Sequence, residues 1–351
     1  MKAIICNKPG EFEKIELEDP IPLDGEIIVK IKKIGICGTD YHAYKGRQPF
    51  FTYPRILGHE LAAEVIHGNE KFKVGEAVVP IPYLHCGNCK TCHSGKTNCC
   101  PHIKTMGVHV DGGMREYTSI PSSNLVKAHD LTDEKIATVE CLSIGAHAVR
   151  RSGLRENQWA AVVGTGPIGI GTLHFARLVG AKTIAIDINE ERLNHCREVL
   201  GVDHCVNALE NPVEALNDIT KGELPDVVFE ATGVPSAMEN AFSYVGHGGR
   251  LVLVSIVKGK IAFEDPLFHS REMTVMSSRN ATEHDFITVM QALRNQEINI
   301  EAFITHRCHF DELTSCFENW SLPESKVILS LIHISEPTRR RGISYAVFCL
   351  K

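Results

Sequence analysis

The segment Ala160–Gly169, AAVVGTGPIG, decides the fold of the second half of this chain. It joins an apolar run to glycines spaced as G-x-G-x-x-G, and residues with helical periodicity follow. Glycines in this pattern permit a tight turn and let a pyrophosphate approach a helix N-terminus, where free N–H groups favour an anion. Because a strand pattern precedes the motif and a helix pattern follows it, the sequence predicts a strand–turn–helix unit that binds a dinucleotide.

The next strand candidate, Thr183–Ile186, runs into Asp187. A carboxylate at this distance is expected to accept a hydrogen bond from the adenosine ribose 2′-hydroxyl and to repel a 2′-phosphate, which favours NAD over NADP. Arg192 either softens that preference or is a solvated helix charge. The expected cofactor-binding residues are Gly164, Gly166, Pro167, Ile168, Gly169, Asp187, Arg192 and Thr232.

Length and composition bound the class of protein. The 351 residues exceed what one hydrophobic core usually organises, which predicts two domains. Short alternating apolar runs in the first third predict a β-rich domain. Strand and helix patterns then alternate from about Gly153 to Ser278, as in the doubly wound parallel sheet of an α/β protein. The net charge of −6, without a basic block before the last few residues, argues against a nucleic-acid partner.

The N-terminus and the cysteine usage indicate the compartment. The opening sequence MKAIICNKPG lacks the apolar region of a secretory signal, and no stretch approaches about 18 uninterrupted apolar residues. We therefore expect a cytoplasmic protein without membrane contact. In a reducing compartment, a crowd of five cysteines between Cys86 and Cys100 indicates metal ligation rather than disulfides.

Four of these cysteines form the first candidate metal site. Cys86, Cys89 and Cys92 stand at two-residue gaps, and Cys100 follows after a loop. Short Cys-x-x-Cys turns let two sulfurs converge on one cation, and four sulfurs close a tetrahedral site of the structural zinc type. On spacing alone, Cys99 competes for the fourth position. Unliganded surface thiols would be a liability, and a nucleic-acid-binding zinc ribbon would need a basic stripe that the surroundings lack.

A second candidate site combines Cys37 with His59 and Glu60. A thiolate, an imidazole and a carboxylate would give zinc three protein ligands and leave one position for an alcohol or water. Each fragment by itself is weak evidence for a metal site. A single cysteine more often packs in a buried core, and a His-Glu pair is usually incidental.

Taken together, these motifs resemble the zinc-containing medium-chain alcohol dehydrogenase family, and within it the sorbitol, threonine and sugar-acid dehydrogenase branch. The segments G-I-C-G-T-D, G-H-E and C-x2-C-x2-C-x7-C stand in the family's order before G-x-G-x-x-G, and the resemblance covers residues 1 to about 329. It implies a GroES-like catalytic domain of residues 1–150 and 286–329, with a Rossmann domain of residues 151–285 inserted. It also implies two zinc ions per chain, NAD, and a homodimer or homotetramer.

The resemblance also implies which residues hold the metals. Catalytic zinc falls on Cys37 and His59, with Glu60 nearby or ligating. Glu140 is expected to approach the metal or its water, although Cys141 replaces the proline that usually follows it. The structural zinc ligands implied by the resemblance, which prefers Cys100 to Cys99, are Cys86, Cys89, Cys92 and Cys100.

Alcohol oxidation in a closed cleft also needs a route for the hydroxyl proton. Zinc lowers the pKa of the alcohol as a Lewis acid, and the nicotinamide takes the hydride. Thr39, two residues after Cys37, is expected to relay the proton to His42, whose pKa lies near the working range. The alternative for Thr39 and His42 is an ordinary turn with a satisfied hydrogen bond.

The predicted substrate is a sugar acid, an L-galactonate-like aldonate, oxidised at a secondary alcohol. Segments between residues 107 and 282 resemble those of L-galactonate-type dehydrogenases. Arg279 is expected to bind the carboxylate with Lys258 as a second positive charge, while Asn280 and His109 hydrogen-bond hydroxyls. Alternatively, Arg279 anchors the dinucleotide or the domain interface, and the substrate is a neutral polyol such as sorbitol, or threonine.

Two rival functions are disfavoured. A zinc-free quinone or enoyl reductase would keep the glycine motif but lack both cysteine sets. A dinucleotide-sensing regulator would use zinc only for structure, which the joint presence of Cys37, Thr39, His42, His59 and Glu60 argues against.

The C-terminal tail, residues 330–351, is predicted to be foreign to the native fold. The family's chains end soon after the strand that matches Lys326–Leu329, whereas here a basic EPTRRR run and an apolar ISYAVFCL run follow. This resembles out-of-frame or adaptor-derived translation. The alternative is a genuine extra strand or an oligomer contact.

Overall fold

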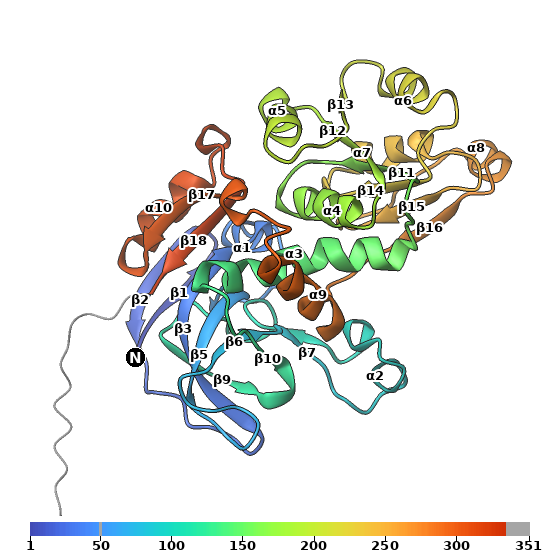
Figure 1. Cartoon of the computed structure of the whole chain (residues 1–351). Coiled ribbons are helices and arrows are strands. Elements are labelled where there is room, and N and C mark those ends of the chain that lie inside the picture. Colours follow the sequence, from blue (N-terminus) through green and yellow to red (C-terminus); the bar gives the residue numbers. More distant parts are fainter. Residues whose placement is uncertain (49–50, 335–351) are drawn as a thin grey trace, which may run out of the picture.

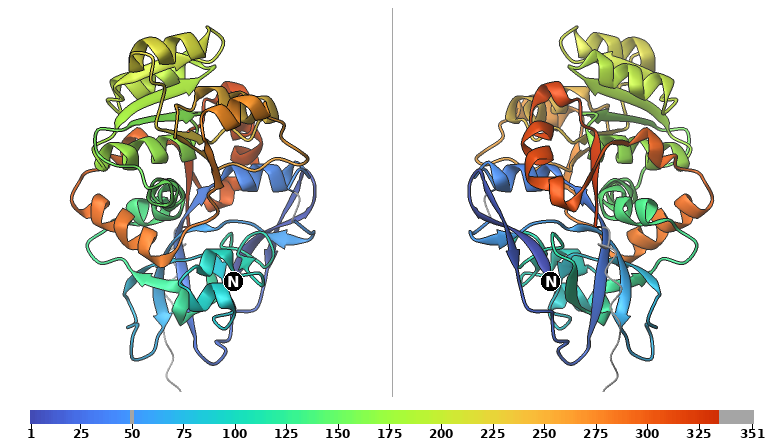
Figure 2. Two further views of the ribbon diagram at one scale, coloured as in Figure 1. Left: turned by 90° about the vertical axis from the view of Figure 1, so that its right-hand side faces the viewer. Right: turned by 90° about the vertical axis from the view of Figure 1, so that its left-hand side faces the viewer.

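The computed structural model describes residues 1–48 and 51–334, which form two sheet-based lobes joined by one long helix (Figure 1). This helix, α3 (Asp133–Ser152), packs against both β5 (Glu60–His67) of the N-terminal lobe and α4 (Pro167–Leu178) of the Rossmann lobe. Figure 2 shows from two opposite sides that the Rossmann lobe, green through yellow to orange, lies towards one end of the molecule and the mostly blue to cyan N-terminal lobe towards the other. The helix therefore connects the two cores.

Local chemistry sets the ends of α3. The Thr132 side chain accepts a hydrogen bond from the Lys135 N–H, and Gly153 ends the helix with a φ of 65°, a left-handed conformation that glycine adopts at little cost. Within the described ranges, neither α3 nor any other helix is long and apolar enough to cross a membrane.

The Rossmann lobe is a six-stranded parallel sheet in the order β13-β12-β11-β14-β15-β16. The order reverses between β11 and β14, and such a switch point is where dinucleotides bind in open α/β sheets. The predicted α/β fold is confirmed, and the predicted strands lie in this sheet. Its strands are β11 (Trp159–Val163), β12 (Lys182–Asp187), β13 (His204–Asn207), β14 (Val227–Glu230), β15 (Arg250–Leu253) and β16 (Thr274–Ser277). Its other helices are α5 (Glu190–Glu198), α6 (Pro212–Thr220), α7 (Pro235–Ala241) and α8 (Asp265–Ser270).

The N-terminal lobe is β-rich, as predicted. A seven-stranded sheet has the order β10-β6-β5-β3-β18-β17 with β9 beside β3, and the smaller sheets are β2-β1-β4 and β7-β8. The strands not yet named are β1 (Lys2–Lys8), β2 (Glu11–Glu16), β3 (Glu26–Ile36), β4 (Arg55–Ile56), β6 (Ala77–Pro80), β7 (Tyr83–Leu84), β8 (Lys104–Thr105), β9 (Tyr117–Pro121) and β10 (Leu125–Lys127). Two short helices, α1 (Gly38–Tyr44) and α2 (Lys90–His93), interrupt them.

After the Rossmann sheet the chain returns to the N-terminal lobe. It passes through α9 (Glu283–Arg294), which packs on α3, and then adds β17 (Ile304–His309), α10 (Leu313–Trp320) and β18 (Leu329–His333). The expected domain borders, after residues 150 and 285, fall inside α3 and α9. These borders stay predictions.

The first residues of the predicted foreign tail lie in a strand of this sheet, and their foreign origin stays a prediction. Strand β18 pairs parallel with β17 and antiparallel with β3, and Ser330, Leu331 and Ile332 are buried. A strand between two others satisfies backbone N–H and C=O groups on both of its edges, so these residues complete the sheet. Residues 335–351, the remainder of the predicted foreign tail, lie outside the described residues.

Candidate active site

The second predicted metal constellation comes together in the N-terminal lobe. Cys37 follows strand β3 and precedes α1, while His59 and Glu60 stand at the start of β5, the neighbouring strand. One ligand atom from each of the three residues lies within 4.8 Å of the others. The antiparallel register pairs Gly35 with Glu60, and this pairing brings the two sequence fragments to one point.

The donor set fits a metal ion. His59 Nδ1 and both carboxylate oxygens of Glu60 are buried and have no hydrogen-bond partner within the part of the chain described. Buried polar atoms are rarely left unpaired, because their lost hydration costs free energy. Burial raises the pKa of Cys37 to about 12 and that of Glu60 well above its usual value. Thiolate, imidazole and carboxylate donors would be satisfied by one zinc ion, which would also stabilise their deprotonated forms.

Gly35 provides the space for the Glu60 side chain. A Cβ atom at Gly35 would lie 2.1 Å from Glu60 Oε2 and 2.8 Å from Glu60 Cβ. Since such contacts are shorter than any van der Waals distance, a side chain at position 35 would displace the carboxylate. The glycine before Ile36-Cys37 therefore belongs to the site.

Asp40 is a site residue that the sequence argument missed. Its buried carboxylate accepts hydrogen bonds from the N–H groups of Cys37 at 3.0 Å and Gly58 at 3.2 Å. It also lies 3.7 Å from His59 Nδ1. Burial alone would lower the pKa of His59, but the charges of Asp40, Glu140 and Glu60 outweigh it and raise that pKa. The sequence did offer one signal for Asp40. It is the third residue of helix α1, and the residue that caps this helix, Cys37, is a candidate metal ligand.

Glu140 lies close to this cluster but is held differently. It stands inside α3, is buried, and accepts a hydrogen bond from the hydroxyl of Tyr83 on β7. Helix α3 runs unbroken through Glu140 and Cys141, the residue that replaces the expected proline. Burial and nearby carboxylates raise the pKa of Cys141 well above its usual value. Glu140 is not part of the group of three whose ligand atoms converge.

Thr39 and His42 both lie on α1. Thr39 is half-buried beside Cys37, whereas His42 is exposed. Partial burial and the charges of Arg47 and Lys45 lower the pKa of His42. Between the described side chains of Thr39 and His42 no direct hydrogen bond is present, so their proton relay stays a prediction.

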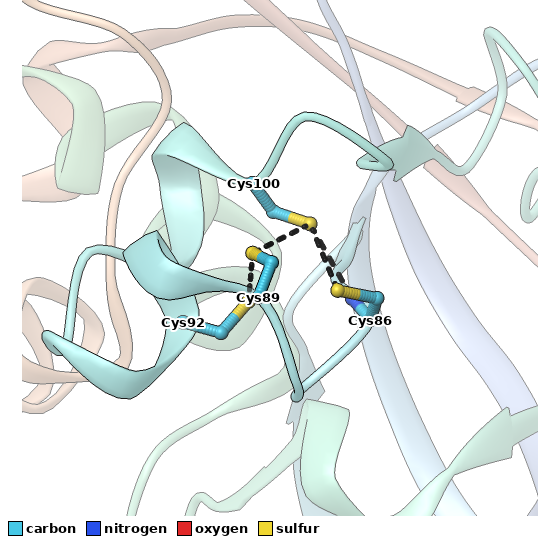
Figure 3. A group of neighbouring side chains, drawn as sticks. All are labelled: Cys86, Cys89, Cys92 and Cys100. Atoms are coloured by element: carbon cyan, nitrogen blue, oxygen red, sulfur yellow. Dashed lines mark hydrogen bonds between the residues drawn. The ribbon is translucent and has the colours of Figure 1, made fainter.

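The four predicted structural ligands also converge (Figure 3). Cys89 Sγ lies 3.4 Å from Cys92 Sγ and 3.8 Å from Cys100 Sγ, and Cys100 Sγ lies 3.5 Å from Cys86 Sγ. Four sulfurs this close match a closed tetrahedral site. Cys99 is exposed and takes no part in the group, so the geometry selects Cys100.

Hydrogen bonding and desolvation shift the pKa values of two thiols of this group in opposite directions. Hydrogen bonds lower the pKa of Cys89 to about 5, and the bond with the Thr91 hydroxyl has the largest effect. Desolvation and the hydrogen bond with Cys89 raise the pKa of Cys92 to about 12. The thiolate, rather than the thiol, is the metal ligand, so Cys89 offers a first point of attachment.

The glycine motif connects β11 to α4 as predicted. Gly164 has a φ of 91°, and a Cβ there would lie 2.7 Å from Thr232 Cγ2, which places Thr232 against the loop. A Cβ at Gly169 would lie 1.8 Å from the Gly164 carbonyl oxygen. Pro167 is the first residue of α4, and Ile168 is the second. The glycines are thus required for close packing and leave the helix N-terminus accessible at the switch point.

Asp187 ends β12 and is nearly buried. Its carboxylate accepts hydrogen bonds from the N–H and hydroxyl of Thr165, both at 2.7 Å, and from the N–H of Asn189 at 3.0 Å. These bonds fix the carboxylate against the glycine loop. Arg192 is half-buried on α5, where the Asn189 side chain accepts a bond from its backbone N–H. Strand β14, on the other side of β11, ends in Glu230, a buried carboxylate that the sequence argument missed and that accepts a hydrogen bond from the Thr232 N–H at 2.7 Å.

The four predicted substrate residues are only partly brought together. Burial lowers the pKa of His109, and the nearby charge of Arg279 adds to the effect, so these two residues are neighbours. Asn280 follows Arg279 in a left-handed conformation with a φ of 52°. Lys258 is exposed, and within the described chain no contact joins it to Arg279.

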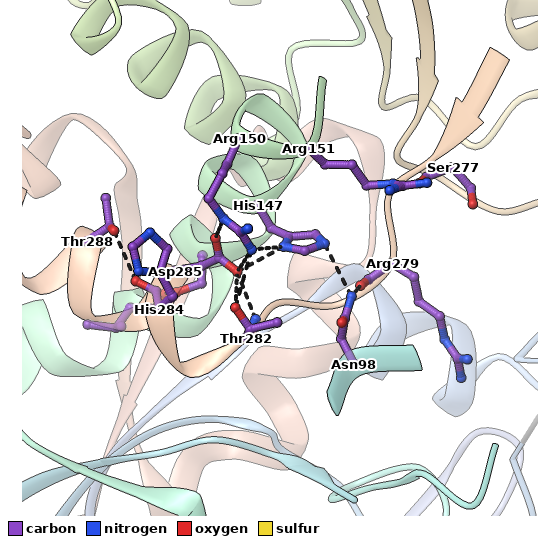
Figure 4. A network of polar contacts seen from close by, with 12 residues as sticks. Asn98, His147, Arg150, Arg151, Ser277, Arg279, Thr282, His284, Asp285 and Thr288 are labelled. Carbon is purple, nitrogen blue, oxygen red and sulfur yellow. Dashed lines mark hydrogen bonds and ion pairs between the residues drawn. The ribbon is translucent and has the colours of Figure 1, made fainter. Parts of the chain in front are cut away.

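A polar network fixes the backbone at Arg279 (Figure 4). Buried Asn98, from the cysteine-rich loop, donates from Nδ2 to the Arg279 carbonyl at 2.8 Å and to His147 Nε2 at 3.2 Å. His147 Nδ1 lies 2.8 Å from Asp285, which also accepts from Arg150 Nε at 2.7 Å. Figure 4 shows the Arg279 side chain pointing away from this network, so its guanidinium is not used there.

Comparisons with known proteins agree with this geometry. The zinc-binding dehydrogenase family matches residues 167–295, and the alcohol dehydrogenase GroES-like domain matches residues 23–130. The chain is 39% identical over 335 residues to the L-galactonate-5-dehydrogenase of Escherichia coli (strain K12), covering 95% of this chain and 98% of that protein. It is 30% identical over 330 residues to the L-threonine 3-dehydrogenase of Pyrococcus horikoshii, covering 91% and 94%. A crystal structure of a short chain alcohol dehydrogenase from E. coli CFT073, complexed with NADH, superposes with a TM-score of 0.88 at 30% identity, covering 95% of this chain and 99% of that one.

Proposed function

Since this chain belongs to the zinc-binding dehydrogenases with an alcohol dehydrogenase GroES-like domain, we propose that it oxidises a secondary alcohol of an L-galactonate-like aldonate with NAD. The observation that carries the proposal is the convergence of Cys37, His59 and Glu60. Within the part of the chain described, the buried His59 Nδ1 and both Glu60 carboxylate oxygens have no hydrogen-bond partner. Three protein ligands leave zinc one coordination position, which is the property of a catalytic site.

The two metal sites have different roles in this proposal. The four thiols from Cys86 to Cys100 form a closed set that holds structural zinc. The three-residue set binds catalytic zinc, which when bound lowers the pKa of an alcohol hydroxyl, while NAD accepts the hydride.

The residues of the chain then bind, orient and deprotonate the substrate. Thr39, beside Cys37, accepts the hydroxyl proton in a relay, and His42 on the exposed face of α1 passes it to solvent. The lowered pKa of His42 suits it to release a proton near neutral pH. Asp187 holds the adenosine ribose at the end of β12, and its charge disfavours the 2′-phosphate of NADP.

Recognition of a sugar acid depends in this proposal on Arg279. Arg279 has its backbone fixed by Asn98 while its guanidinium is free of the network, so the side chain is available for a bidentate bond to a carboxylate. His109 and Asn280 are the candidates for hydrogen bonds to substrate hydroxyls, and Lys258 is the candidate for a second positive charge at the carboxylate. The relative named for L-galactonate supports this substrate class.

The test compares kcat/KM for L-galactonate and for a matched neutral polyol in wild type and in Arg279→Ala. We expect wild type to prefer the acid, and the substitution to lower kcat/KM for the acid about 10-fold or more, because a hydrogen bond to a charged group contributes about 1.5–3 kcal/mol. The polyol should be affected far less. Arg294→Ala, on the exposed surface of α9, is the matched control. A wild-type preference for the polyol, or equal losses for both substrates, would reject carboxylate recognition by Arg279.

L-threonine is the second candidate substrate, favoured by the threonine dehydrogenase relative. Because it also carries a carboxylate, Arg279→Ala would weaken both acids, and only the wild-type specificity constants separate them. The expected homodimer or homotetramer is tested by light scattering on the purified protein. Absence of NAD-dependent turnover across acids and polyols would favour the dinucleotide-sensing alternative.

A further inference from the structure

The two buried glutamates beside the candidate catalytic zinc site differ in one respect. Glu60 has no hydrogen-bond partner for either carboxylate oxygen among the described residues, whereas Glu140 accepts a hydrogen bond from the Tyr83 hydroxyl. Both side chains are buried, so water does not compensate for a missing partner. The metal is therefore the partner that Glu60 needs, while Glu140 already has one.

Tyr83 is itself held firmly. It lies on β7 with 4% of its surface exposed, and its ring meets Phe286 edge-on at a centroid distance of 6.4 Å. Its backbone carbonyl accepts a hydrogen bond from Asn124 Nδ2 at 3.0 Å. A phenol fixed at both the ring and the backbone keeps its hydroxyl in one place, and so restrains the carboxylate that it binds.

We propose that Tyr83 is a positioning residue that holds Glu140 outside the ligand set of the catalytic zinc, so that one coordination position stays open for the substrate hydroxyl. The inference rests on the proposed zinc site. Glu140 is close enough for its charge to act on Cys37 and His59, and a buried carboxylate at that range is attracted to a divalent cation. A second carboxylate on zinc, added to Cys37, His59 and Glu60, would close the tetrahedron and exclude substrate.

The experiment uses full-length enzyme whose exchangeable catalytic zinc is replaced by Co²⁺, with imidazole as a probe of the open position. Visible absorption reports whether imidazole enters the coordination shell. In Tyr83→Phe we expect imidazole to bind about 10-fold more weakly than in wild type, the equivalent of one hydrogen bond to a charged group. The same variant should lose its catalytic zinc to a chelator more slowly, because a fourth protein ligand now holds it.

A second substitution separates positioning from general damage. Tyr83→Phe/Glu140→Gln should restore wild-type imidazole binding, since a neutral amide is a poor zinc ligand. Tyr41→Phe is the matched control, because Tyr41 is also largely buried near the site but its hydroxyl contacts Ser330 at 3.4 Å and not a carboxylate. It should bind imidazole like wild type.

Each result decides a different question. If wild type binds no metal at the Cys37 site, the proposed function fails before the role of Tyr83 is reached. If wild type binds metal, but Tyr83→Phe matches it in imidazole affinity and zinc loss, or Glu140→Gln brings no restoration, the positioning role is overturned. Should Tyr83→Phe not fold, a crystal structure of zinc-loaded wild type decides, because a Glu140 oxygen at a zinc–oxygen bond length of about 2.0–2.2 Å would also overturn it.

Discussion

Replacing Asp285 with asparagine should destabilise the junction between the two lobes by about 3 kcal/mol. The Asp285 carboxylate is 1% exposed and accepts bonds from His147 on α3, from Arg150 at the end of α3, and from Thr282 in the preceding loop. The Asn98 amide donates to His147 Nε2, so the ring proton is on Nδ1 and is donated to Asp285. An asparagine would turn an amide N–H towards these donors.

The magnitude follows from the two bonds to the charged carboxylate. The buried bond from His147 contributes about 1.5–3 kcal/mol. The Arg150 side chain is 46% exposed, so solvent screening limits its ion pair to about 1 kcal/mol. With about 2.1 cal/mol/K of unfolding entropy per residue, the 351-residue chain has about 0.7 kcal/mol/K, and a loss of about 3 kcal/mol lowers Tm by about 4 °C.

Calorimetry of the zinc-loaded protein measures the shift, with Asp203→Asn as the matched control. Asp203 accepts from the N–H and hydroxyl of Thr183, both at 2.8 Å, as Asp285 does from Thr282, but Asp203 is exposed. Burial alone would raise the pKa of Asp285, but bonds from His147 and Arg150 lower it below its usual value. Its contribution is therefore present above the unfolded pKa near 3.9 and is lost as pH falls through the lower folded pKa. Equal Tm shifts in Asp285→Asn and Asp203→Asn would refute the reasoning. A loss of stability in Asp285→Asn, relative to wild type, that grows as the pH falls from 8 to 5 would also refute it.

The remaining predictions concern the metals, the cofactor and the C-terminus. Metal analysis should find two zincs per chain in wild type. Cys100→Ser should lose the structural zinc and have a lower Tm. His59→Ala should lose the catalytic zinc and turnover but keep the circular dichroism spectrum of wild type. A single zinc per wild-type chain would contradict the two-site assignment. Asp187→Ala should raise the ratio of kcat/KM for NADP to that for NAD about 10-fold or more, because the substitution removes repulsion of the 2′-phosphate. A wild-type preference for NADP would contradict this role of Asp187. Deleting residues 335–351 should leave activity unchanged, but deleting 330–351 should yield aggregated protein because it removes a central strand; similar solubility of the two truncations would contradict the role of β18.

Sequence reasoning succeeded where residue chemistry and short spacing carry the information. Cysteines at two-residue gaps have few uses in a reducing compartment, so the group from Cys86 to Cys100 was predictable, and geometry then chose Cys100 over Cys99. The glycine motif was predictable because its spacing matches one turn between a strand and a helix. The burial of the residues that follow Leu329 was not predictable, because it depends on β3 and β17, which flank them only in the folded sheet, while the foreign origin of the tail stays a prediction.

Some of the residues that sequence reasoning missed have partners that are distant in the chain, unlike Asp40 and Glu230, which also bond to close neighbours in sequence. Tyr83 and Glu140 are 57 residues apart, and Asn98 and Arg279 are 181 apart. Tyrosine and asparagine have many ordinary uses, so nothing local distinguishes Tyr83 or Asn98 from a surface residue of the same type. Their roles depend on the crossing of α3 between the lobes, which brings the cysteine-rich loop, the catalytic cluster and the loop before α9 to one helix. Because Glu140 and His147 are seven residues apart on α3, close to two helical turns, they lie on nearly the same face of that helix. The helix that joins the two lobes therefore carries Glu140 beside the metal site and His147, whose partner Asn98 holds the backbone of Arg279.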